Sequence, residues 1–230
     1  MIKKVYLNQP GRFGDILYVI PIARRLMERG YDVFFLIREK YKSLIPHFPD
    51  INFVDPESHP TVIEPYIFLP LWNGATYFQD DPTHNKDIMT DKYAMYNIVM
   101  KDDIDPESYW RRLTFERFSE KEKLLFKILG LKDGEKYVLI NEHSFNGTRK
   151  IDVKTDLKKV YMGIEGELKQ FDLLDWSLVM ENAEEIHTIH TSVIYVLEVL
   201  KTTSKLHLYE RLKGKVPITH ILNKHYIQHD

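Results

Sequence analysis

The residues best suited to chemistry lie in the loop Gly11-Arg-Phe-Gly-Asp15, between the first predicted strand and the first predicted helix. Gly11 and Gly14 allow a ligand to approach the backbone closely. A helix that starts here presents free N–H groups, and Arg12 adds a fixed cation, so the loop suits an anionic ligand. Its spacing matches neither the dinucleotide fingerprint nor a P-loop. Asp15 is either a functional carboxylate or an acid that stabilises the helix start.

A second candidate site is the polar loop Glu142–Lys150, which follows a predicted strand. Asn146, Thr148, Arg149 and Lys150 offer amide, hydroxyl and cationic donors of the kind that bind a diphosphate. The Asn-Gly pair inside the loop is also common in surface turns, so a simple polar turn is the alternative.

A third segment, His190-Thr-Ser192, stands where a predicted strand runs into a predicted helix. The hydroxyls of Thr191 and Ser192 at a helix start favour an anion. His187 and His190 are three residues apart on a strand and therefore point to opposite faces, which argues against a metal pair.

Strands and helices alternate along the chain, as in a parallel α/β fold. Expected strands are 4–7, 32–37, 51–54, 66–69, 137–140, 159–162, 185–189 and 205–209, and expected helices are 15–29, 39–48, 92–100, 123–129, 175–182 and 191–200. The alternation restarts after Gly130, so we expect two domains, 1–130 and 131–230. A last short helix is expected after Thr219, where helical spacing would bring His225 and His229 together; a frayed polar tail is the alternative.

Composition limits the class of protein. The 230 residues are 43% hydrophobic and 29% charged, with a net charge of −2, as in ordinary globular proteins. A nucleic-acid binder normally shows a basic face, and nothing in this balance requires one, so no nucleic-acid partner is expected. The chain has no cysteine, which excludes disulfides and thiolate metal sites. No segment has the apolar length of a signal peptide or a membrane span, and we expect a cytoplasmic protein.

The first loop and the helix that follows it resemble a known protein family. The segments Gly14-Asp-Ile-Leu17 and Pro21-Ile-Ala23, with Leu26 and the strand Val33–Ile37, resemble the opening of the heptosyltransferase-type glycosyltransferases (the ADP-heptose:LPS type). The resemblance implies a short, divergent member with the GT-B fold, in which two Rossmann-like parallel-sheet domains face a cleft. It also implies inverting transfer of a sugar from a nucleotide-diphosphate donor to an acceptor hydroxyl.

The resemblance assigns roles to the three segments. Asp15 becomes the general base, in an N-terminal domain on the acceptor side, and a carboxylate suits that role. The C-terminal domain becomes the donor domain. The residues assigned to the donor and its phosphates are Gly11, Arg12, Gly14, Asn146, Thr148, Arg149, Lys150, His190, Thr191 and Ser192. The resemblance implies a glycan or lipid-linked acceptor, no metal, and no cofactor besides the nucleotide-sugar co-substrate.

The third segment departs from the family pattern Asp-Ser/Thr-Gly-x-x-His. His190 replaces the Asp, Ser192 the Gly and Tyr195 the His. Two alternatives therefore stay open: a catalytically silent nucleotide- or sugar-binding module of the same fold, and a sugar-nucleotide epimerase-like enzyme.

Overall fold

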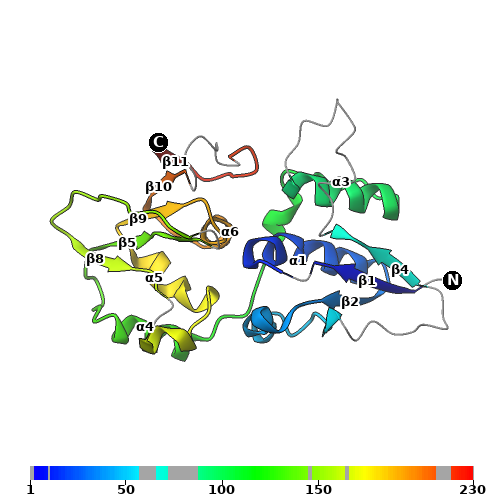
Figure 1. Ribbon diagram of the computed structural model, residues 1–230, viewed down its shortest axis with the longest axis horizontal. Helices are drawn as coiled ribbons and strands as arrows, with labels where there is room; N and C mark the ends of the chain where they lie inside the picture. The colour runs from blue at the N-terminus through cyan, green and yellow to red at the C-terminus, as the bar shows by residue number, and fades with distance from the viewer. Residues whose placement is uncertain are drawn as a thin grey trace. The chain divides into compact units, whose positions relative to one another are not determined.

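The computed structural model describes residues 3–9, 11–56, 66–71, 88–144, 147–163, 166–210 and 219–229. The chain forms two compact units, residues 1–116 and 117–230. Each unit contains a parallel β-sheet with helices (Figure 1), which confirms the predicted α/β class. The division falls before the expected position near residue 130, because the helix that starts at Ser119 packs on helices of the second unit.

The first unit carries a four-stranded parallel sheet in the order β3-β2-β1-β4. Its elements are β1 (Lys4–Asn8), α1 (Phe13–Glu28), β2 (Asp32–Leu36), the 3₁₀ helix η1 (Glu39–His47), β3 (Phe53–Val54), β4 (Tyr66–Leu69), α3 (Ile88–Met100) and the 3₁₀ helix η4 (Tyr109–Arg112).

The core of this unit forms around α1. Helix α1 buries an unbroken run from Ile16 to Ala23, because it packs against β2 on one side and against α3 and η4 on others. Tyr18 stacks on Trp110, and both side chains are fully buried. The aromatic residues around Tyr93 thus belong to the core, as aromatic residues at helical spacing usually do.

The second unit carries a five-stranded parallel sheet in the order β11-β10-β9-β5-β8 and a small antiparallel hairpin, β6-β7. Its elements are α4 (Ser119–Ile128), β5 (Tyr137–Asn141), β6 (His143–Ser144), β7 (Gly147–Thr148), β8 (Lys158–Tyr161), the 3₁₀ helices η5 (Gly166–Gln170) and η6 (Leu174–Trp176), α5 (Ser177–Asn182), β9 (Glu185–Ile189), α6 (Val193–Val199), β10 (Lys205–Tyr209) and β11 (Tyr226–His229).

Both sheets have a switch point, where the order of strands reverses. In the first unit the chain passes from β1 to β2 and β3 and then returns to place β4 on the other side of β1. In the second it passes from β5 to β8 and then places β9 on the other side of β5. Ligands in open α/β sheets bind outside the carboxyl ends of strands at such points.

The C-terminal tail was predicted wrongly as a short helix. Residues Tyr226–His229 form strand β11, which pairs in parallel with β10. The edge of β10 offers unpaired backbone groups, and pairing there satisfies the tail's own backbone. The helical pairing of His225 with His229 is therefore absent.

Candidate functional site

The loop between β1 and α1 lies at the switch point of the first sheet. Arg12 precedes α1 with φ 61° and ψ 127°, a conformation that L residues rarely adopt. Gly11 packs so closely on Tyr41 that an added Cβ would lie 2.8 Å from the Cε2 atom of the ring. Backbone strain of this kind is concentrated at functional sites.

Asp15 stands in the first turn of α1, where an acid stabilises the start of a helix. Its Oδ1 lies 3.2 Å from Nζ of Lys92, which comes from α3. The Lys92 side chain is fully buried, whereas 15% of the Asp15 side chain is exposed. The carboxylate thus has one side against a buried ammonium group and remains partly open to solvent.

Lys92 joins both strands that flank the switch point. Its ammonium group donates to Oε1 of Gln9, just after β1, at 2.8 Å, and to the carbonyl of Leu71, just after β4, at 3.0 Å. Burial lowers the pKa of Lys92 below its usual value, and the Asp15 carboxylate opposes part of that shift. A buried lysine with three oxygen partners fixes the position of Asp15.

Sequence reasoning missed Lys92. The lysine lies 83 residues beyond Gln9 in the chain, and no local pattern connects the two. The sequence did contain one signal, a lysine inside the otherwise mostly apolar helix α3. A lysine in such a helix is rarely buried unless it is paired, so a buried partner could have been expected for it.

The second switch point brings together two of the predicted segments. Asn141, the last residue of β5, donates through Nδ2 to Oγ1 of Thr188 and to Oγ1 of Thr191, each at 3.0 Å. The backbone N–H of His190 bonds to the carbonyl of Tyr209 at 3.1 Å. Ser192 precedes α6, and its side chain makes no capping hydrogen bond. The segment His190–Ser192 is thus anchored at the carboxyl ends of β5, β9 and β10.

The polar loop after β5 contains the β6–β7 hairpin. Oγ1 of Thr148 lies 3.1 Å from Nδ1 of His143, and Arg149 donates to the carbonyl of Glu210, just after β10. Lys150 Nζ is 3.0 Å from Oε2 of the buried Glu142, while most of the lysine side chain is exposed. Asn146 lies outside the described residues.

The residues of both loops of the second unit therefore lie at the carboxyl ends of its strands. Arg149 reaches the end of β10, and Thr191 contacts the end of β5. Gly11, Arg12, Gly14 and Asp15 belong to the other unit.

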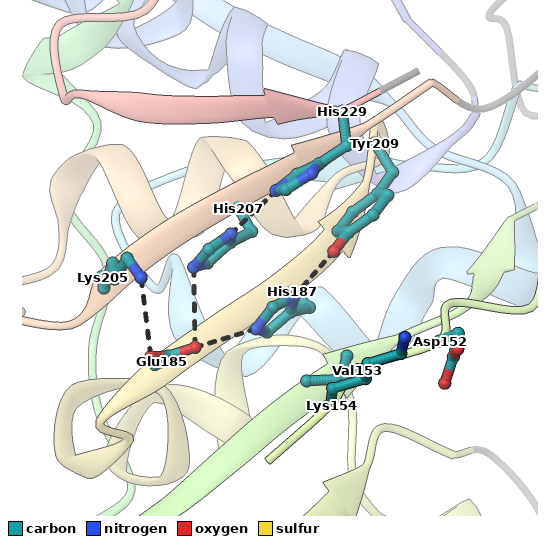
Figure 2. Close-up of a pocket in the computed structure, with 9 residues that line it drawn as sticks. All are labelled: Asp152, Val153, Lys154, Glu185, His187, Lys205, His207, Tyr209 and His229. Carbon is teal, nitrogen blue, oxygen red and sulfur yellow. Dashed lines mark hydrogen bonds and ion pairs between the residues drawn. The ribbon is translucent and has the colours of Figure 1, made fainter.

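A separate pocket of about 540 Å³ lies on one face of the second sheet (Figure 2). It is lined by Asp152, Val153, Lys154, Glu185, His187, Lys205, His207, Tyr209 and His229. Burial lowers the pKa of His187, and burial together with the neighbouring His187 lowers the pKa of His207 to about 4. From the sequence, His187 could be compared only with His190, which was judged not to form a metal pair with it; the neighbours of His187 on β10 follow from the register of the sheet.

Two parallel α/β units with polar residues at both switch points define a GT-B-like fold. No protein-family model matches the sequence, and a search of curated proteins found no match. Several solved structures do match.

A glycosyl transferase family 9 protein from Veillonella parvula shares the fold with a TM-score of 0.54 and 11% identity, over 90% of this chain and 80% of its own. E. coli ADP-heptose LPS heptosyltransferase II matches with a TM-score of 0.52 and 9% identity, over 99% of this chain and 90% of its own. The dodecameric iron-containing heptosyltransferase TibC of enterotoxigenic E. coli, solved with ADP-D-β-D-heptose, matches with a TM-score of 0.53 and 14% identity. The match covers 90% of this chain but 57% of TibC.

These similarities, all at low identity, show that the fold is that of the heptosyltransferase-type glycosyltransferases. The resemblance read from Gly14–Ala23 predicted the same fold. In the described part of the chain, no helix has both the length and the apolar character needed to cross a membrane.

Proposed function

We propose that this chain is a glycosyltransferase that moves a sugar from a nucleotide-diphosphate donor to an acceptor hydroxyl with inversion. The observation that carries the proposal is the Asp15–Lys92 pair at the switch point of a unit whose fold is shared with solved glycosyltransferases.

Asp15 acts as general base in this proposal. Lys92 contacts Oδ1, so Oδ2 is the oxygen that takes the acceptor proton. As the proton leaves, the acceptor oxygen attacks the anomeric carbon, and the bond from that carbon to the diphosphate oxygen breaks on the opposite face. The electron pair of that bond leaves with the nucleoside diphosphate.

Lys92 is a positioning residue in this reaction. Its links to Gln9 and Leu71 hold the ammonium group at the switch point, and the ammonium group in turn holds the carboxylate. A carboxylate held in one orientation loses less entropy when the acceptor binds.

The donor binds to the second unit at its own switch point. Thr191 and Ser192 supply hydroxyl donors beside α6, and Arg149 and Lys150 supply positive charge for the diphosphate. Lys150 has to exchange its contact with Glu142 for the phosphate, which its mostly exposed side chain permits.

The first test is binding. Melting temperatures are measured with a panel of nucleotide-sugars and nucleoside diphosphates at millimolar concentration. A ligand at 100 times its Kd stabilises a folded protein by about 2.7 kcal/mol. Stabilisation by at least one nucleotide supports the donor assignment, and no shift with any of them would overturn it.

The second test is turnover by Asp15→Asn with the donor that binds best. Loss of a general base lowers kcat by about 10²–10⁴-fold, whereas donor affinity should stay near that of the parent protein. Asp32→Asn, which changes an exposed carboxylate of the same unit, is the control. Near-normal turnover by Asp15→Asn would remove the base assignment.

A further inference from the structure

The pocket of the second unit lies on the face of the sheet opposite to helices α5 and α6. Right-handed crossovers from β8 to β9 and from β9 to β10 place those two helices on the same face of the sheet. On the opposite face, Ile151 and Val153 of the connection before β8 pack on Val138, Ile140 and Ile189. The pocket opens beside this small apolar cluster.

The sheet register groups the polar residues of the pocket. Residues two apart on a strand share a face, which places Glu185 with His187 and Lys205 with His207. Parallel pairing then sets His207 directly beside His187, and Lys205 beside Glu185 (Figure 2).

The possible ligand atoms of three side chains lie within 4.8 Å of one another. Oε2 of Glu185 lies 3.2 Å from Nε2 of His187 and 3.6 Å from Nε2 of His207. Ligands at the usual distance of roughly 2.0–2.1 Å around a tetrahedral Zn²⁺ ion are about 3.3 Å apart. The two spacings therefore match the edges of a metal site.

The Nδ1 atom of each ring lies within hydrogen-bonding distance of a neighbouring side chain. Nδ1 of His187 lies 2.9 Å from the Tyr209 hydroxyl, and Nδ1 of His207 lies 2.8 Å from Nε2 of His229. Such outer contacts orient metal-binding histidines and fix which nitrogen faces the ion. Here both contacts leave Nε2 directed at Glu185 (Figure 2).

His207 supplies an independent observation. Its Nε2 is buried and has no hydrogen-bond partner among the described residues, since the Glu185 oxygen is beyond hydrogen-bonding distance. A buried polar atom without a partner is costly, and an ion would satisfy it.

We propose that Glu185, His187 and His207 form a binding site for a divalent first-row transition-metal ion, with Zn²⁺ as its simplest occupant. Two imidazoles and one carboxylate suit such ions and leave a coordination position open toward the pocket. Lys205 lies 3.7 Å from Oε1 of Glu185 and thus pairs with the other carboxylate oxygen. The rings of His187 and His207, now stacked at 4.1 Å with 8° between their planes, must tilt to share the ion.

The test measures metal binding by the full chain, without an affinity tag that contains histidine. ZnCl₂ is titrated by calorimetry, and CoCl₂ by its visible absorption, which intensifies in tetrahedral sites. We expect one ion per chain, and at least a 100-fold weaker affinity after His207→Gln or Glu185→Gln. His225→Gln, which changes an exposed histidine of the same unit, is the matched control and should bind as the parent does.

A second measurement uses the parent chain, so that the proposal can be tested even if a variant fails to fold. The side-chain ¹⁵N resonances of His187 and His207 should shift on addition of Zn²⁺, and those of His225 should not. The proposal is overturned if the parent chain binds no ion, or if binding survives both substitutions and the histidine resonances stay in place. None of these measurements depends on sugar transfer, so the result is independent of the proposed function.

Discussion

Nζ of Lys92 lies 3.2 Å from Oδ1 of Asp15, and this ion pair joins helix α3 of the first unit to the first turn of helix α1. The lysine is fully buried, and its other partners follow β1 and β4, on either side of the switch point. The pair is therefore both part of the fold and part of the proposed catalytic site.

A double-mutant cycle should detect this coupling. Asp15→Asn leaves a buried ammonium group without its carboxylate, and Lys92→Met leaves Gln9 and Leu71 without their donor. Each change should lower the free energy of unfolding, by about 1–3 kcal/mol for each buried group left unpaired. The double variant should lose less than the sum, with a coupling energy of about 0.5–3 kcal/mol measured by urea denaturation. Strict additivity would show that the pair contributes nothing beyond its separate parts.

Arg12 should carry backbone strain that glycine removes. Its φ of 61° is rarely adopted by L residues, and strain of this kind costs about 1–3 kcal/mol. Arg12→Gly should raise the free energy of unfolding by about 1 kcal/mol, because the extra chain entropy of glycine offsets part of the gain. If Arg12 holds the donor or acceptor, the same variant should lose turnover. A less stable Arg12→Gly variant would mean that the contacts of the arginine side chain outweigh the strain.

The sequence predicted those parts of the fold that local pattern determines. Gly11, Gly14 and the apolar periodicity that follows Asp15 indicated a strand, a loop and a helix, and the structure has all three. The segment at His190 was likewise placed correctly between β9 and α6. In both segments the residues that determine the local structure are close together in the sequence, within one helical turn or one strand of each other.

Contacts between distant segments could not be predicted in this way. Lys92 reaches Gln9 because α3 packs against α1, beside the end of β1, and His187 meets His207 through the register of β9 with β10. The strand at Tyr226–His229 depends on the edge of β10 and has little alternating pattern of its own.

Acid should reveal the contribution of Asp102 to the first unit. The Arg25 guanidinium, bonded to this carboxylate, holds the pKa of Asp102 well below its usual value, with help from Tyr96. Arg29 and the backbone N–H of Asp103 also face it. Because the folded pKa is depressed, the stabilisation is complete above the unfolded pKa of about 3.9 and is lost as pH falls toward the folded value.

Asp102→Asn should therefore lower the free energy of unfolding at pH 7 by about 2 kcal/mol, the scale of hydrogen bonds to a charged group. The difference from the parent chain should shrink as the pH falls below about 4. Urea denaturation between pH 2.5 and 7 measures both, with Asp32→Asn as the control at an exposed site. A difference that stays constant with pH would exclude a contribution from ionised Asp102.

The donor assignment predicts a specific effect at Thr191. Its Oγ1 accepts a hydrogen bond from Asn141 across the second switch point, and the proposed function assigns the same hydroxyl to the diphosphate. Thr191→Val keeps the side-chain shape and removes the hydroxyl. The variant should lose about 1 kcal/mol of stability and bind the best nucleotide about tenfold more weakly, which corresponds to about 1.4 kcal/mol.

Thr203→Val is the control for that comparison, since Thr203 is an exposed threonine of the same unit. Calorimetric titration with the nucleotide separates the two effects, because Kd is measured on folded protein well below the melting temperature. Weaker binding by Thr191→Val alone supports a donor site at the carboxyl ends of β5 and β9. Equal affinity in both variants and the parent would place the diphosphate away from Thr191, and the hydrogen bond from Asn141 would then be purely structural.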